Sequence, residues 1–312
     1  MNKKLNLLKQ RIIKLSAILM TMAIMQSCFT GVEGTQKITL SKKDIHITAP
    51  TEEERYLDDM QPSPLREWKQ GKRFLVTDEK FQLVVERNSS NPVAKGDTIT
   101  YVGIEKRQSP GGEESSAIVF DSSAGKLTYP IDKTPERASD EITSLQLPMM
   151  IELDMVENVK RKLHGNELWT RSALWYDEEM KYQKGGKYVR VLIEDVEPGN
   201  TFFPLLVKFK DDEGTTGSYL MNIGNSGTDS RSFSRLFYLS DPRNNYKHIS
   251  DENWAAIQKE EVRLGMTKEE CRLSKGNPMD TNSGHSYSST MEIWKYSDGT
   301  ILRFVDGQLI SF

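Results

Sequence analysis

Apolar and polar positions alternate in several short stretches of the chain, which predicts a protein built mainly of strands. The alternation is clear in residues 98–102 and 188–193, where β-branched and aromatic side chains are also frequent. The sequences FDSSAG (120–125) and KDDEGT (210–215) follow further apolar runs. Asp and Gly tolerate the backbone angles of tight turns, so both sequences predict hairpin connections.

The strand-rich stretches form a weak internal repeat. Its first copy covers residues 65–131 and its second copy covers residues 159–223. The aligned pairs are Gly71 with Gly165, Phe120 with Phe209, and Gly125 with Gly214. The repeat predicts two modules of one design, and chance similarity between two β-rich segments is the alternative.

A helix is predicted immediately before the second copy, over residues 151–163. Ile151, Met155, Val159 and Leu163 are each four residues apart, which places them in one apolar stripe. Gly165 is expected to end this helix. Each unit is therefore expected to be a short helix followed by a small antiparallel barrel or curled sheet. This arrangement resembles the SH3-like barrels.

The last 60 or so residues predict two helices followed by three strands. A first helix contains Trp254 and Ile257, and its continuation to residues 261–262 is left open. A polar loop is expected at residues 279–289. The three strands are expected at residues 291–296, 300–305 and 308–312, joined by SDG and DG turns.

The second helix of this region has well-defined start and stop signals. Thr267 and Glu270 have the spacing of a capping box, and Met266 and Cys271 occupy the positions of a hydrophobic staple. Gly276 is expected to end the helix. Cys271 is therefore predicted to face the core, without a chemical role.

The order GMTKEE…GNP, followed by W-x-Y and F-x-DG-x-L, resembles the SmpA/OmlA (BamE-type) lipoprotein domain and the related β-lactamase-inhibitor-protein-like fold. The resemblance covers residues 254–312. It implies a binding or scaffolding domain without catalytic residues. Members of that family consist of little else, whereas this chain has most of its length in front of the matching region.

The N-terminus has the features of a secretory signal. Five basic residues precede the apolar run at residues 15–25, and the first acidic residue is Glu33. A membrane-spanning helix needs about 20 apolar residues, so this run of 11 is too short to span. Residues 1–27 are therefore predicted to be a signal peptide.

The sequence MQSC at the end of this signal resembles a bacterial lipoprotein signal. The resemblance implies that the thiol of Cys28 receives a lipid and that Cys28 becomes the new N-terminus. Phe29 stands where inner-membrane retention signals often have Asp, which implies sorting to the outer membrane, and the lack of an acidic cluster favours its periplasmic face. An ordinary cleaved signal with a chance cysteine is the alternative.

These patterns predict an α+β, β-rich chain with two small antiparallel barrel-like modules and a C-terminal ααβββ module. The expected divisions are a signal peptide at 1–27, a tether at 28–62, the first module at 63–133, a linker helix with the second module at 134–249, and the C-terminal module at 250–312.

Charge argues against nucleic acid as a partner. Without residues 1–27 the chain has 37 Lys and Arg against 45 Asp and Glu, a net charge of −8. An acidic chain of this kind lacks the overall attraction to phosphate backbones or anionic lipids.

No catalytic or metal-binding set is evident. The four histidines, His46, His164, His248 and His285, lack metal-ligand spacing. IGNSGTDS (223–230) is similar to the nucleophile turn of chymotrypsin-like proteases, but no histidine lies in a suitable context to activate Ser226. The acidic runs EEER (52–55) and DDE (211–213) are expected to be solvated faces or turns.

The sequence therefore predicts a non-enzymatic lipoprotein of the bacterial envelope, anchored in the outer membrane, that binds or scaffolds an unknown envelope protein and needs no cofactor. One alternative is capture of a peptide or glycan by aromatic residues of the second module, namely Trp169, Trp175, Tyr176, Phe202 and Phe203. A hydrolase with unidentified catalytic residues is the other alternative.

Overall fold

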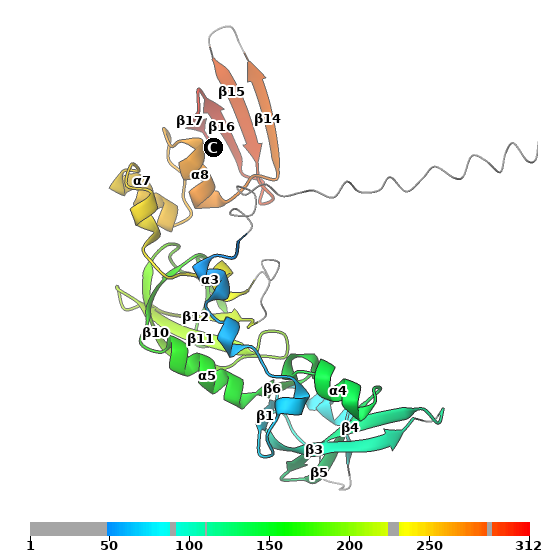
Figure 1. Ribbon diagram of the computed structural model, residues 1–312. Coiled ribbons are helices and arrows are strands. Elements are labelled where there is room, and N and C mark those ends of the chain that lie inside the picture. Colours follow the sequence, from blue (N-terminus) through cyan, green and yellow to red (C-terminus); the bar gives the residue numbers. More distant parts are fainter. Residues whose placement is uncertain (1–48, 88–91, 110, 224–230, 286–288) are drawn as a thin grey trace, which may run out of the picture. The chain divides into compact units, whose positions relative to one another are not determined.

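The structure is a computed structural model that describes residues 49–87, 92–109, 111–223, 231–285 and 289–312 (Figure 1). The predicted signal peptide and the predicted lipidation site, Cys28, lie outside the described residues, as do His46 and Ser226. No helix among the described residues is both long and apolar enough to cross a membrane. The described chain is rich in strands, which form two curled antiparallel sheets and a smaller third sheet.

The first sheet has six strands in the order β2–β5–β4–β3–β1–β6, and all neighbours are antiparallel. Its strands are β1 (Arg73–Val76), β2 (Glu86–Arg87), β3 (Thr98–Gln108), β4 (Glu114–Ser122), β5 (Gly125–Ile131) and β6 (Met150–Glu152). Short helices connect them: η3 (Leu65–Glu67) precedes β1, η4 (Glu79–Leu83) follows it, and α4 (Pro135–Glu141) and η5 (Ser144–Gln146) precede β6.

Aromatic rings fill the first core. The Trp68 and Phe74 ring centroids lie 5.0 Å apart, and Phe74 meets Phe120 edge to face at 5.5 Å. Ala138, Leu147 and Met150 also pack in this core, although the sequence places them beyond the expected end of the first module at residue 133. The reason is that β6 returns to pair with β1, so the sheet is completed by residues that follow α4.

The second sheet has seven strands in the order β13–β7–β10–β11–β12–β8–β9. They are β7 (Glu167–Thr170), β8 (Leu174–Tyr176), β9 (Tyr182–Lys184), β10 (Arg190–Pro198), β11 (Leu205–Asp211), β12 (Thr216–Met221) and β13 (Phe237–Tyr238). The short helix α6 (Phe233–Leu236) precedes β13, and the longer α5 (Leu153–Leu163) packs against the sheet.

The predicted apolar stripe of α5 is confirmed in large part. Met155, Val159 and Leu163 are buried in the second core, and Gly165 follows the helix end with a positive φ of 77°. Ile151 is also in that core, but it belongs to β6 rather than to the helix.

The two curled sheets share one strand order, which supports the internal repeat. Strands β1, β3, β4, β5 and β6 correspond to β7, β10, β11, β12 and β13. The Gly71 amide donates to the carbonyl of Tyr101 at 2.9 Å, and the Gly165 amide donates to the carbonyl of Ile193 at the same distance. Tyr101 lies opposite Phe120 and Ile193 lies opposite Phe209, and a register shift follows both positions.

The last part of the predicted tether is folded. Residues after Thr51 form α3 (Glu52–Arg55) and η2 (Asp58–Met60). Leu57 is buried in the second core, and the Tyr56 ring stacks on Phe233 with centroids 4.6 Å apart. The expected tether at 28–62 is therefore too long at its C-terminal end, because these apolar side chains have a core to pack against.

The C-terminal region contains α7 (Asp251–Gln258) and α8 (Lys268–Lys275), followed by four strands rather than three. The strands β14 (Asp280–His285), β15 (Thr290–Lys295), β16 (Ile301–Val305) and β17 (Gln308–Ser311) are antiparallel neighbours in chain order. The prediction of a polar loop over 279–289 was wrong for 280–285, because a polar edge strand needs only backbone pairing with β15. Helix α7 ends at Gln258, before residues 261–262.

Candidate protein-binding face of the C-terminal module

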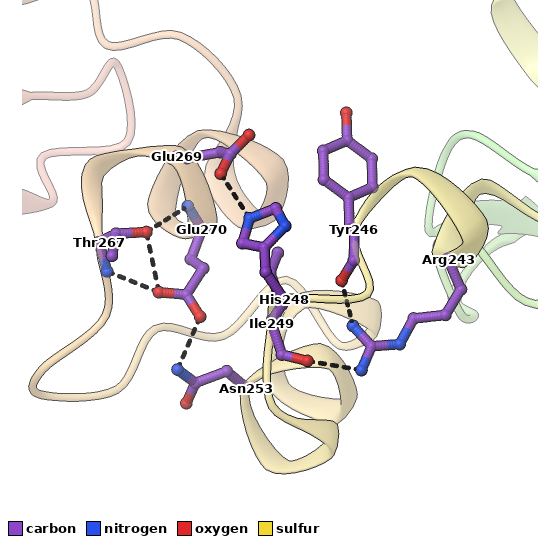
Figure 2. Close-up of polar contacts among 8 residues, drawn as sticks. All are labelled: Arg243, Tyr246, His248, Ile249, Asn253, Thr267, Glu269 and Glu270. Carbon is purple, nitrogen blue, oxygen red and sulfur yellow. Dashed lines mark hydrogen bonds and ion pairs between the residues drawn. The ribbon is translucent and has the colours of Figure 1, made fainter.

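The two C-terminal helices begin side by side and are joined by a carboxylate. Figure 2 shows Glu270 accepting from the Thr267 amide at 2.7 Å and from the Asn253 side-chain amide at 2.8 Å. The Glu270 amide in turn donates to the Thr267 hydroxyl, which completes the predicted capping box of α8. Burial opposes ionisation of Glu270, but these hydrogen bonds outweigh it and lower the pKa of the carboxyl.

The segment before α7 is fixed to both helices. The Arg243 guanidinium donates to the carbonyls of Tyr246 and Ile249, and His248 contacts the carboxylate of Glu269 on α8 at 2.9 Å (Figure 2). The guanidinium also lies 5.0 Å from the ring centre of Trp254 on α7. These contacts of Arg243 and His248 therefore help to hold the N-terminal ends of α7 and α8 in place.

Helix α8 lies against one face of the four-stranded sheet, and α7 packs beside α8 with side chains in the same core. Trp294, Leu302, Phe304 and Leu309 point into the third core and are at most 1% exposed. Met266 and Cys271 are buried in the same core, as the hydrophobic staple predicts. Burial raises the pKa of the Cys271 thiol to about 12, which disfavours the reactive thiolate.

The opposite face of this sheet carries exposed apolar side chains on its two central strands, β15 and β16. Because successive strand residues point to opposite faces, the neighbours of the buried residues form this surface. Met291 is 45% exposed and Ile301 is 36% exposed, while Ile293 and Val305 are partly buried between them. Ile310 and Phe312, at the bulged end of β17, are also exposed. We call Met291, Ile293, Ile301 and Val305 the open sheet face.

Charged side chains accompany the open sheet face, and among them Asp280 of β14 contacts Lys295 at 4.0 Å. Arg303 lies opposite Ile293 in the register and is exposed, and Lys295 lies opposite Ile301. Contiguous exposed apolar patches with charged or polar surroundings are typical of interaction sites. The alternation of Ile301, Arg303 and Val305 against Leu302 and Phe304, which the sequence shows, is thus confirmed as an outside–inside pattern.

A second surface is a hollow of about 350 Å³ on the second module. Its lining includes Tyr176, Leu206 and Lys208, together with the acidic residues Asp177, Glu178, Glu194 and Glu197. Glu197 is paired with Lys208 at 2.6 Å, and Asp177 accepts amide hydrogens of its own turn. Glu178 and Glu194 are exposed to solvent, so they lack the burial that adapts a carboxyl group to act as a general acid.

The aromatic residues proposed for ligand capture have different environments. Trp175 is fully buried, and a Cβ on Gly185 or Gly217 would lie within 2.6 Å of its ring. Tyr176 is mostly buried, and Trp169 and Phe203 are partly buried. Phe202 alone among these five is largely exposed, at 79%. The five residues therefore do not form one exposed aromatic surface.

Among the described residues, His164 and His248 are not brought together. His164 contacts the carbonyl of Glu194, far along the chain from the His248–Glu269 contact. Asp211 accepts amide hydrogens of Glu213 and Thr215, which confirms the DDE run as a turn. Within the described ranges, no group of three His, Cys, Asp or Glu side chains could hold a metal ion.

Comparison with known proteins gives no relative. No family model matches the chain, and neither a curated protein nor a solved structure matches it.

Proposed function

We propose that this protein is a membrane-anchored lipoprotein of the bacterial envelope that binds or scaffolds another protein and is not an enzyme. The observation that carries the binding role is the open sheet face, where apolar side chains of β15 and β16 are exposed opposite a well-packed core. Transfer of such a surface from water to a partner is favourable by about 25 cal/mol per Å² of apolar area.

The anchor is Cys28, which receives a lipid on its thiol and becomes the N-terminus when residues 1–27 are then removed, with the protein held in the outer membrane and facing the periplasm. Support comes from the basic start, the short apolar run and the MQSC sequence. Several acyl chains on one cysteine hold a protein stably at a bilayer, so no membrane-spanning helix is required.

We also propose a fold type for the two curled sheets and for the C-terminal module. The curled sheets are SH3-like barrels, and their common strand order with a short helix before the last strand supports this assignment. The C-terminal module is BamE-like, and its two capped helices, which share one core with the sheet, support this assignment. The extra edge strand β14 is a departure from the expected ααβββ order.

The binding role is tested by placing a charge on the open sheet face. Ile301→Asp and Met291→Asp should each abolish recovery of the partner after crosslinking in intact cells, because an unpaired charge in an apolar interface is costly. Leu264→Asp is the matched control, since Leu264 is 66% exposed in the same module but precedes α8. Equal recovery from all three variants would exclude the open sheet face as the binding site.

The anchor is tested separately. A fatty-acid analogue should label the wild-type protein in cells and should not label Cys28→Ser. Labelling of both proteins to the same extent would contradict lipidation at Cys28, whatever the result of the crosslinking.

Capture of a peptide or glycan is the second candidate, favoured by the hollow beside Tyr176. Leu206→Trp would fill this hollow, so it should abolish capture of such a ligand and leave partner crosslinking unchanged. A hydrolase using the acidic residues of the hollow would instead lose activity in Glu194→Gln.

A further inference from the structure

Two buried polar atoms have no hydrogen-bond partner among the described residues. One is the Oε2 atom of Glu152, at the end of β6, and the other is the hydroxyl oxygen of Ser144 in η5. The side chain of Glu152 is 5% exposed, and Ser144 is 4% exposed. Such groups usually have a partner in folded proteins, because leaving one unpaired costs about 1–3 kcal/mol and more for a charged group.

Only one oxygen of Glu152 is used within the described structure. Its Oε1 atom is paired with the ammonium group of Lys72, which is itself 12% exposed. The Lys72 nitrogen also lies 5.5 Å from the ring centre of Trp68, so the lysine is held from the side of the first core. The ion pair thereby fixes the carboxylate, while its second oxygen is buried without a hydrogen-bond partner among the described residues.

Glu152 and Ser144 line the same hollow, of about 160 Å³. This hollow lies where the two modules meet, because β6 and α5 contribute Ile151 and Met155 while the β10–β11 connection contributes Thr201 and Phe202. A hydrogen bond of 2.8 Å between the Thr77 and Thr201 hydroxyls ties the first module to that connection. The hollow has room for several water molecules. Fewer would be needed to give the two buried polar atoms a hydrogen-bond partner each.

The lining of this hollow is mostly apolar and includes one acidic side chain. Of the described residues around the hollow, Glu152 is the only one with a charge, and most of the others are apolar. The apolar group consists of Leu145, Leu147, Met150, Ile151, Met155, Phe202 and Pro204. Leu145 and Phe202 are exposed at 42% and 79%, so the apolar wall continues to the molecular surface.

Apolar lining residues next to a buried carboxylate oxygen are suited to a ligand that has a cationic group at the end of a short alkyl chain. The alkyl chain would lie along the apolar side chains, and the terminal N–H groups would donate to Glu152 and Ser144. Hydrogen bonds to a charged group are stronger than neutral ones, and a guanidinium has several donors in a fixed plane. We propose that this hollow binds an alkylguanidinium or alkylammonium group, either from a free small cation or from an arginine or lysine of another protein. The proposal is independent of the open sheet face, which uses different residues.

The test compares two ligands of the same shape on the full chain in detergent micelles. N-butylguanidinium carries the cation, and N-butylurea is its neutral counterpart. Ligand-observed saturation-transfer NMR should give weak but saturable binding of the guanidinium compound, as expected for so few atoms. The urea should bind about tenfold more weakly, since a charge-assisted hydrogen bond exceeds a neutral one by about 1.4 kcal/mol. No binding of the cation, or equal binding of the urea, would overturn the proposal.

Variants then locate the binding. Glu152→Gln keeps the shape of the side chain and should lower the affinity for butylguanidinium about tenfold. Glu86→Gln is the matched control, because Glu86 is an exposed acid of the first module that pairs with Arg107. Phe202→Ala should also weaken binding, and its exposed position makes a folding defect easy to exclude. Unchanged affinity in Phe202→Ala, or equal losses in the two Glu variants, would contradict binding in this hollow.

The source of the cation is distinguished by a third ligand, N-acetyl-arginine amide. Competition with butylguanidinium would support the proposal with an arginine of another protein as the occupant. Failure to compete, while butylguanidinium binds, would support the proposal with a free small cation as the occupant.

Discussion

The ammonium nitrogen of Lys187 lies 2.8 Å from the carbonyl oxygen of Leu273, so a side chain of the second module caps the end of helix α8. The same nitrogen is 3.4 Å from the carbonyl of Ser274. Beside it, the rings of Tyr188 and Trp254 stack with centroids 5.5 Å apart. Lysine near a helix C-terminus complements both the free carbonyls and the helix dipole. These contacts join the third core to the second module.

Replacing Lys187 should therefore loosen the end of α8. Lys187→Met keeps the length of the side chain but removes the donors, and we expect a loss of about 1–2 kcal/mol in the free energy of unfolding. Amide exchange of α8, measured by mass spectrometry, should become faster. Lys184→Met is the control, since Lys184 is exposed on β9. Equal exchange in the two variants would show that the Lys187–Leu273 contact does not stabilise the helix.

The capping box should contribute to stability as a coupled pair. Thr267→Ala should cost about 1 kcal/mol, the usual loss for a helix cap. Thr267→Ala and Glu270→Ala combined should cost less than the sum of the two single changes, because each removes part of one set of hydrogen bonds. Urea unfolding of the four proteins measures this coupling, and strictly additive losses would contradict it.

Acid should weaken the same helix junction. The pKa of Glu270 is lower in the folded protein than its ordinary value of 4.5. Its contribution to stability is therefore complete above pH 4.5 and is lost as the pH falls through the folded pKa. In Glu270→Gln the dependence of unfolding free energy on pH should be shallower over this acidic range. An unchanged slope would show that Glu270 does not contribute to it.

Alkali should also destabilise the protein. Burial raises the pKa of Tyr296 to about 12 and that of Cys271 to about 12, above the ordinary values of 10.0 and 9.0. A raised folded-state pKa adds stability below the ordinary value, and this stability is lost as the pH rises towards the folded value. The free energy of unfolding should fall from pH 9.0 upward. Lys187 has the opposite effect on the pH dependence of the unfolding free energy, because burial lowers its pKa in the folded protein.

The contribution of Cys271 to this loss of stability at alkaline pH can be tested separately. In a Cys28→Ser chain, a thiol reagent at about pH 8 should react with Cys271 only as fast as the protein opens, because the side chain is fully buried. Cys271→Ala should reduce the fall in stability just above pH 9.0. Rapid reaction with the folded protein would contradict the buried position.

Replacement of Gly276 by alanine should destabilise the protein more than the same replacement of Gly284. The φ and ψ angles of Gly276 at the end of α8 are 83° and −166°, a region that is almost restricted to glycine and costs other residues about 1–3 kcal/mol. Gly284 lies on β14 without a positive φ, and a Cβ there would meet no atom within 4 Å. Gly276→Ala should lower the midpoint of thermal unfolding, whereas Gly284→Ala should leave it nearly unchanged. Equal midpoints would show that the backbone at Gly276 relaxes without cost.

Local signals in the sequence were sufficient for several elements. The Thr267–Glu270 capping box, the buried position of Cys271 and the turns around Gly125 and Gly214 depend on residues within a few positions of each other. Such short-range rules can be applied without knowing what else packs nearby. The internal repeat was also visible, because the paired glycines and phenylalanines recur in the same order.

Long-range pairing decided what the sequence left open or misplaced. The polar residues 280–285 form a strand only because β15 supplies a backbone partner, and Leu57 is buried only because the second core accepts it.

The inter-module hollow is a further feature that the sequence alone did not reveal. Lys72 and Glu152 are 80 positions apart, and Ser144 meets the same hollow from a different element. The sequence by itself thus determined the caps, turns, periodicity and the candidate anchor at Cys28. Only the tertiary structure decided which sheet face is exposed and which carboxylate oxygen is buried without a partner among the described residues. The reason is that burial depends on residues brought together from distant parts of the chain.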